Sequence, residues 1–197
     1  MTQSQPGDVR ECIIQEATHL FVSRGYRGIS MREIAEAVGV SKAGLYYHFK
    51  DKEALFLAIL TANLERIEAI VREARSEEVT ARGQISRMVR AIFEQSPYQR
   101  AIIRLASQEM PHLSQTARAE FGCLYRARFI GQVEDILRAG MEAGELRAMD
   151  VSLATWLLLG MMYPFLYPAH EREQGPAQAV IDLLVSVFFD GVTARNV

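Results

Sequence analysis

The segment at residues 41–48, SKAGLYYH, carries side chains that could bind the phosphates and base edges of DNA. Lys42 provides a long cation that could reach a phosphate or a guanine edge. The small side chains beside it would let the backbone approach a groove, and the N–H groups of a helix that begins here would favour phosphate. Burying Tyr46, Tyr47 and His48 in a row would be costly, so we expect some of them to face DNA and part of Tyr46 to be packed.

Two short helices joined by a tight turn would hold this segment in place. Ser30 and Glu33 have the spacing of a capping box, and apolar residues at helical spacing follow them. Gly39 suits the turn because it tolerates a positive φ, and Ala35 would allow the helices to cross closely. The sequence therefore predicts a helix-turn-helix at about residues 30–50, although an ordinary αα-hairpin would use the same packing.

Charge and hydropathy narrow the class of protein. The 197 residues carry a formal net charge of -2, and 49% of them are hydrophobic, which is enough for a core in one domain or two small ones. Between residues 24 and 52, six basic side chains stand against three acidic ones, which would help docking on phosphates. No run approaches the roughly 18–20 apolar residues of a membrane span, and the N-terminus has no apolar signal core, so we expect a cytoplasmic protein. Cys12 and Cys123 lie far apart, which favours two buried, reduced thiols over a redox pair.

The periodicity of apolar residues is helical along the whole chain, which predicts an all-α fold of about nine helices. Residues 1–50 would form the DNA-binding helix-turn-helix domain, and residues 51–197 a larger helical body. Asp51 would cap a long helix at the start of that body. Further helices are expected at about 80–95, 98–110, 115–140, 151–167 and 175–192, separated by prolines and glycines.

The run from Ser30 to Leu55, with the pattern I-A-x-x-x-G-V-S-K-A-G-L-Y-Y-H-F-K-D-K-E-A-L, resembles the DNA-binding domain of the TetR family of repressors. The resemblance implies an all-α homodimer with nine or ten helices per subunit. It implies phosphate contacts from Ser30, Tyr46 and Lys52, with Arg32 as a flanking contact. It implies groove contacts from Lys42, Ala43, Gly44, Tyr47 and His48. The candidate DNA contacts are therefore Ser30, Arg32, Ser41, Lys42, Ala43, Gly44, Tyr46, Tyr47, His48 and Lys52.

In that family the body binds a small effector, and here polar and aromatic residues mixed into apolar helices indicate a largely apolar pocket. The candidates are Met88, Phe93, Arg104, Leu105, His112, Tyr125, Arg128, Phe129, Trp156, Met162 and Tyr163. Tyr125, Arg128 and Phe129 form the strongest group, although each residue alone would also suit a core or surface position. The span 105–147 is similar to ligand domains of regulators of fatty-acid and sterol breakdown, some of which sense acyl-CoA thioesters. An acidic ligand would fit Arg104 or Arg128.

The last two expected helices are apolar on more than one face, which predicts burial on more than one face. We expect one face to pack on the body and the other on a second copy, in an isologous four-helix interface. The predicted interface residues are Leu153, Leu157, Gly160, Met161, Ile181, Leu184, Val185 and Phe188. A core helix in a monomer is the alternative.

The expected mechanism is that of a repressor. A homodimer would hold two recognition helices about one turn of DNA apart, on a pseudo-palindromic operator, and a small-molecule effector would release it. An activator or co-repressor of the same family is the alternative. An enzyme is disfavoured because the chain has no HExxH, GxSxG, GxGxxG or P-loop motif, although a catalytic pair could still assemble in space. The four histidines lack ligand spacing, so we expect no metal and no cofactor.

Overall fold

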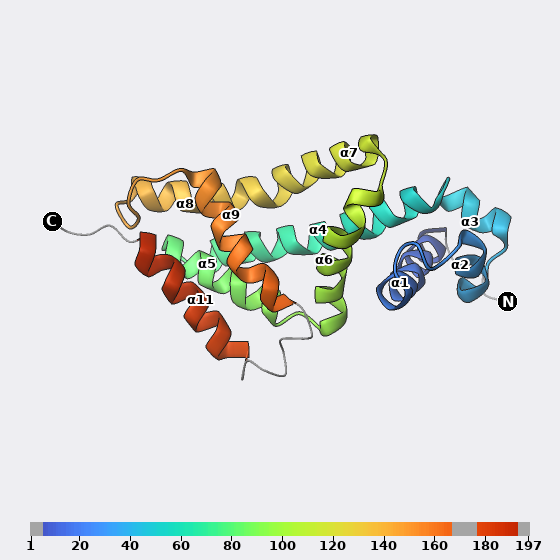
Figure 1. Ribbon diagram of the computed structural model, residues 1–197, viewed down its shortest axis with the longest axis horizontal. Helices are drawn as coiled ribbons and strands as arrows, with labels where there is room; N and C mark the ends of the chain where they lie inside the picture. Colours follow the sequence, from blue (N-terminus) through green and yellow to red (C-terminus); the bar gives the residue numbers. More distant parts are fainter. Residues whose placement is uncertain (1–5, 167–176, 193–197) are drawn as a thin grey trace. The chain divides into compact units, whose positions relative to one another are not determined.

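The computed structural model describes residues 6–166 and 177–192, and within these ranges the chain is helical, without a β-strand. The predicted all-α class is therefore confirmed. The elements, labelled as in Figure 1, are α1 (Pro6–Arg24), α2 (Met31–Val38), α3 (Lys42–His48), α4 (Lys52–Glu77), α5 (Ala81–Phe93), α6 (Pro97–Glu109), η1 (Met110–His112), α7 (Gln115–Tyr125), η2 (Arg126–Ile130), α8 (Gly131–Glu142), α9 (Val151–Met162), η3 (Tyr163–Leu166) and α11 (Ala177–Val192). None of the described helices is long and apolar enough to cross a membrane.

Contacts divide the chain into two compact units, which we call the head unit and the body unit. The head unit comprises the residues up to 63 together with 101–122, and the body unit comprises 64–100 and the residues from 123 onward. The helices α4, α6 and α7 each contribute residues to both units. The predicted division into residues 1–50 and 51–197 stays a prediction.

Helix boundaries in the head unit follow local side-chain caps. The Ser30 hydroxyl accepts a hydrogen bond from the Glu33 amide, and the Glu33 carboxylate accepts one from the Ser30 amide at 2.8 Å. α2 ends at Gly39, whose φ of 77° lies in the left-handed region. Ser41 then caps α3 by accepting from the Gly44 amide at 3.0 Å. The predicted capping box and turn are confirmed.

The core of the head unit forms where apolar stripes of α1, α2, α3 and α4 meet. Ile13, Ile34 and Leu45 are fully buried there. Phe21 and Phe56 pack edge to face with their ring centroids 5.6 Å apart. α3 is only seven residues long, so this buried surface, rather than its own propensity, must hold it in place.

The body unit packs α8 against α5 and α9, and α11 against α5 (Figure 1). Arg82 of α5 lies over the Phe189 ring of α11, with 5.5 Å between the guanidinium carbon and the ring centroid, and pairs with Asp190 at 3.8 Å. α7, η2 and α8 follow one another without a break, and η2 has π-helical hydrogen bonding. π-helical turns inside α-helices are frequent at functional sites.

Two predictions differ from the structure. Cys12 and Cys123 are exposed rather than buried, because the adjacent Ile13 and Ile14 occupy the inward positions of α1 and position 123 lies on the outer face of α7. The helix expected at 151–167 is α-helical only to Met162 and continues as the 3-10 segment η3, which contains Pro164; residue 167 lies outside the described residues.

Candidate nucleic-acid interface

One face of α3 is buried and the other is open to solvent. Leu45 and Phe49 face the head core with 0% and 4% exposure, whereas Tyr47 is 83% exposed and Tyr46 is 42% exposed. Lys42 is exposed at the first position of the helix. The burial of the i and i+4 positions thus turns the polar and aromatic side chains outward, as a groove-reading helix requires.

The outward face of α3 has a cation that no carboxylate neutralises. The ammonium of Lys42 lies 5.8 Å from the centroid of the Tyr46 ring, and no acidic side chain of the described residues pairs with it. The rings of Tyr47 and His48 meet edge to face at 5.2 Å. A cation at a helix N-terminus is disfavoured by the helix dipole, so an external anion would stabilise Lys42 there.

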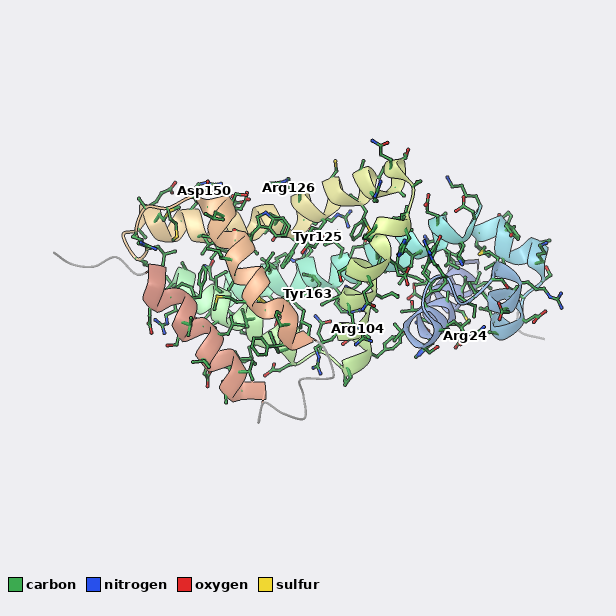
Figure 2. All side chains as sticks on the ribbon, viewed as in Figure 1. Arg24, Arg104, Tyr125, Arg126, Asp150 and Tyr163 are labelled. Carbon is green, nitrogen blue, oxygen red and sulfur yellow. The ribbon has the colours of Figure 1, made fainter. Side chains whose placement is uncertain are left out.

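Two of the predicted flanking contacts already have partners in the head unit. The hydroxyl of Ser30 also donates to Glu33 at 2.7 Å, and Arg32 pairs with Glu36 at 2.8 Å. The pKa of Glu33 falls to about 2 because the Ser30 hydroxyl and amide, and then Arg24, donate to its carboxylate. Arg24 is labelled in Figure 2. The ion pair with Glu36 leaves the Arg32 side chain 80% exposed.

Lys52 is held by neutral groups of the head unit. Its ammonium donates to the Ile29 carbonyl at 2.8 Å and lies 4.5 Å from the centroid of the Tyr26 ring. Burial lowers the pKa of Lys52. These contacts explain a cation in the first turn of α4 without any phosphate, so its predicted phosphate contact stays a prediction.

Hydrogen bonds that local sequence patterns do not predict join the first helices to the segment 109–114. The Tyr26 amide donates to Glu109 at 3.3 Å, and an Arg27 guanidinium nitrogen lies 2.8 Å from Nδ1 of His112. The amide and hydroxyl of Ser114 both donate to the Glu53 carboxylate, at 2.8 and 2.7 Å. His112 was predicted to line the effector pocket, but it is exposed on η1 in the head unit. Only tertiary structure brings these residues together.

Several of the predicted effector residues are buried or half-buried in the body unit. Met88, Phe93, Phe129 and Met162 are buried, and Tyr125 and Tyr163, both labelled in Figure 2, are half-buried. The Tyr125 ring lies 5.5 Å from that of Phe129, and burial raises the pKa of Tyr125 to about 12. Burial therefore disfavours the phenolate form of Tyr125.

The other predicted effector residues are paired with acidic side chains, belong to the head unit or are exposed. Arg128 pairs with Glu65 at 3.2 Å and Glu68 at 3.9 Å, so two carboxylates already surround its charge. Arg104 and Leu105 belong to the head unit, where Leu105 is buried. Trp156 is 50% exposed on the outer face of α9.

Buried polar atoms occur on three side chains that are not among the predicted site residues. The amide of Gln95, the hydroxyl of Thr155 and Oε1 of Glu134 are buried without a hydrogen-bond partner among the described residues. The Glu134 oxygen lies 3.6 Å from an Arg126 guanidinium nitrogen, an ion pair without a hydrogen bond. Buried polar groups normally have partners, so these atoms are open to a ligand or water. Nothing in their sequence context distinguishes them from surface residues.

An apolar face covers α9 and α11. Leu153, Leu157 and Leu183 are 60%, 57% and 65% exposed, with Trp156 and Val187 close to half. A groove of about 540 Å³, lined by residues of α9, η3 and α11, lies on the same helices. The four α11 residues predicted to lie at an interface face inward instead, packed against their own chain: Ile181, Leu184, Val185 and Phe188. Gly160 is open, since a Cβ at this position would meet no atom within 4 Å.

No cluster of three metal-ligating side chains occurs within the described ranges.

Family models match two stretches of the chain. A model of bacterial regulatory proteins of the tetR family matches residues 13–59, and a model of the tetracyclin repressor-like C-terminal domain matches residues 78–164. Together they cover more than half of the chain.

Individual proteins similar to this chain are also transcriptional regulators. The transcriptional repressor KstR2 of Rhodococcus jostii is 28% identical over 147 residues, which are 72% of this chain and 70% of that protein. The structure of the TetR-family regulator PfmR of Thermus thermophilus is 28% identical, with a TM-score of 0.72 over 89% of this chain and 94% of that one. AibR, solved with isovaleryl coenzyme A and operator DNA, has the same fold at 23% identity, with a TM-score of 0.75 over 92% and 98% of the two chains.

Proposed function

Because the chain belongs to the TetR family of bacterial regulatory proteins, we propose that it is a transcriptional repressor whose dimer binds an operator and releases it when a small molecule binds the helical body. The observation that carries this proposal is the outward face of α3. It presents Lys42 without an acidic partner and Tyr47 at 83% exposure, on a helix whose other face is buried in a helix-turn-helix. We infer that the protein works in the cytoplasm, where its DNA is.

The proposed DNA contacts follow from this face. Lys42 and Tyr47 would reach base edges or phosphates from the groove, with Tyr46 and His48 beside them. Ser41, Ala43 and Gly44 would let the start of α3 approach the DNA closely. Ser30, Arg32 and Lys52 would add phosphate contacts. We assign them a supporting role, because each already has an intramolecular partner.

We propose a mostly apolar effector that is recognised by neutral hydrogen-bonding groups. Tyr125 offers a protonated phenol, and the buried Thr155 hydroxyl and Gln95 amide lack partners among the described residues. Such groups suit a carbonyl or amide better than a carboxylate. The glutamates beside Arg128 weaken the case for an arginine that holds an acid. An acyl-CoA thioester, such as the one bound to the structurally similar AibR, is the ligand class that we favour.

We propose that the dimer forms through the outer faces of α9 and α11. Leu153, Trp156, Leu157, Leu183 and Val187 would supply its apolar surface, since they are the large side chains left exposed on these helices. Gly160 would allow close approach of the two copies. Met161 lines the adjoining groove, whereas the inward residues of α11 would support the interface from beneath.

Effector binding would act through elements that belong to both units. α4, α6 and α7 each run from one unit into the other, and the segment 109–114 is hydrogen-bonded to Tyr26, Arg27 and Glu53. A ligand that binds one arrangement of the body more tightly than another would therefore bias the position of α3. The spacing of the two recognition helices would change, and operator affinity would fall.

The double variant Lys42→Ala, Tyr47→Ala tests the proposed reading face. Each lost base contact costs about 1–3 kcal/mol, so operator affinity should fall by at least roughly tenfold. The measurement is fluorescence anisotropy with a duplex selected by the wild-type protein from a random library. Arg138→Ala, on α8 in the body unit, is the control and should bind as the wild type does. Unchanged affinity of the double variant would show that α3 does not read DNA.

A further inference from the structure

The basic side chains of the head unit differ in what neutralises them. Arg24 pairs with Glu33 at 2.7 Å and Arg32 pairs with Glu36 at 2.8 Å, so part of the positive charge is cancelled within the fold. Arg10 is exposed on α1 and has no carboxylate partner among the described residues. A cation of this kind is available to an external anion.

An aromatic ring holds Arg10 beside the recognition helix. Its guanidinium carbon lies 5.2 Å from the centroid of the Phe49 ring, within the range of a cation–π contact. Phe49 is the residue that ends α3, and at 4% exposure its ring is fixed by the head core. α1 thereby places a guanidinium at the C-terminal end of α3.

Among the described residues, none accepts a hydrogen bond from Arg10. A cation–π contact uses the charge of a guanidinium and not its five N–H donors, which lie in the plane of the group. Those donors match the oxygens of a phosphate. When a recognition helix lies in the major groove, the flanking DNA backbones pass its ends.

We propose that Arg10 is a phosphate contact of the DNA complex, which clamps one backbone strand at the C-terminal end of α3. The inference rests on the proposed DNA-reading face. It adds a contact from the first helix, at a position that precedes the stretch matched by the regulatory-family model at 13–59. Phe49 acts as the positioning residue, because its ring sets where the guanidinium lies.

A purely structural Arg10 would behave differently. A cation–π contact at an exposed site stabilises a fold by a modest amount, and its loss would lower the unfolding temperature. It would not alter how operator affinity depends on salt. A phosphate contact releases counterions on binding, so its loss lowers the slope of log affinity against log salt by about 0.9 for each subunit on the DNA.

The experiment compares full-length wild type with Arg10→Gln, Arg10→Lys and Arg118→Gln on a library-selected duplex between roughly 50 and 200 mM salt. With two subunits bound, Arg10→Gln should lose about 1.8 from the slope, so that its affinity falls roughly tenfold less across this range than that of the wild type. Its preference for the selected duplex over a scrambled one should be unchanged, because phosphate contacts carry no sequence information. Arg10→Lys should keep the slope. Arg118→Gln removes the same charge from exposed α7 and should also keep it.

Several results would overturn the proposal. The first is that Arg10→Gln keeps the wild-type slope and shows only a lower melting temperature by circular dichroism. The second is that Arg118→Gln loses as much slope as Arg10→Gln, which would indicate a general charge effect. If the wild type itself selects no duplex, the proposed DNA-binding function fails. If the wild type binds its duplex and the salt slope of Arg10→Gln equals that of the wild type, the proposed function stands and only the Arg10 contact is wrong.

Discussion

Glu33 links the start of α2 to the charge balance of the head unit. Its carboxylate accepts hydrogen bonds from the Ser30 amide and hydroxyl and from Arg24, and these donors lower its pKa to about 2. The side chain therefore stabilises the folded state only while it is ionised. The helix that supports α3 is thus capped by a group whose contribution depends on pH.

The Glu33 cap predicts a defined pH dependence of stability. Because the folded pKa is lower than the ordinary value of 4.5, the contribution of Glu33 is complete above that value and is lost as the pH falls towards 2. The gap in unfolding free energy between wild type and Glu33→Gln should be constant near neutral pH and should narrow between pH 4.5 and 2. Urea unfolding at several pH values measures it. A gap that stays constant down to about pH 2 would contradict the assignment.

Single residues were predictable where their partners are local in sequence. Ser30 with Glu33, and Ser41 with Gly44, follow from spacing alone because a cap reaches only three residues along the chain. Lys52 was not predictable, since its partners, the Ile29 carbonyl and the Tyr26 ring, meet it only after α4 packs on the earlier turn. Arg10 over Phe49 was missed for the same reason.

At the scale of elements, the turn between α2 and α3 depends on one glycine. Gly39 has a φ of 77°, a region that costs a residue with a Cβ roughly 1–2 kcal/mol. A Cβ at this position would meet no atom within 4 Å, so the cost of a substitution is that of the backbone alone. The angle at which α3 leaves α2 is therefore set by backbone conformation rather than by packing around this glycine.

Two glycine-to-alanine variants should act in opposite directions. Gly39→Ala should lower the unfolding free energy by about 1 kcal/mol. Gly122→Ala, at an open position inside α7, should raise it by about 0.5–1 kcal/mol, because alanine is the better helix former. Both residues belong to the head unit, so one chemical-denaturation assay compares them. A loss of stability in both variants would mean that the positive φ of Gly39 does not explain the destabilisation of Gly39→Ala.

Apolar periodicity predicted the helices better than the faces that they bury. α2 has one apolar stripe, and the expected residues, such as Ile34, are buried. α11 is apolar nearly all round, so its sequence does not say which stripe meets the body. We expected Ile181 and Leu184 to face outward, but they are buried, and Leu183 at 65% exposure is the outward residue. The packing of α11 against α5 decides which stripe is buried, and exposed ion pairs of Arg82 with Asp190 and of Arg90 with Asp182 border this contact.

At the scale of the whole molecule, the proposed binding to an operator requires two copies of the chain. The proposed dimer places the exposed leucines of α9 and α11 against a second copy. Burial of such side chains removes apolar surface from water, a transfer term of about 25 cal/mol for each Å² that offsets part of the entropic cost of association. Within α9 and η3 no side chain is charged, so nothing on these segments opposes the contact.

Leu157→Glu should convert the dimer into a monomer. A carboxylate at a 57% exposed site would be buried without a partner in the assembled interface. Light scattering at micromolar concentration should give half the wild-type mass, and operator affinity should fall because the two recognition helices are no longer linked. Val79→Glu makes the same change at a 95% exposed position after α4 and should leave the dimer intact. A dimeric Leu157→Glu protein would refute the proposed interface.

The position of Trp156 has an optical consequence. It is the only tryptophan in the chain, and half of its surface faces solvent in the single subunit. An indole in water emits at longer wavelength and is quenched by iodide, whereas an indole enclosed by a partner emits at shorter wavelength and is shielded. In the proposed dimer Trp156 lies in the interface, so dilution of the unlabelled protein should shift its fluorescence towards the red, and the native chain would carry its own reporter of assembly.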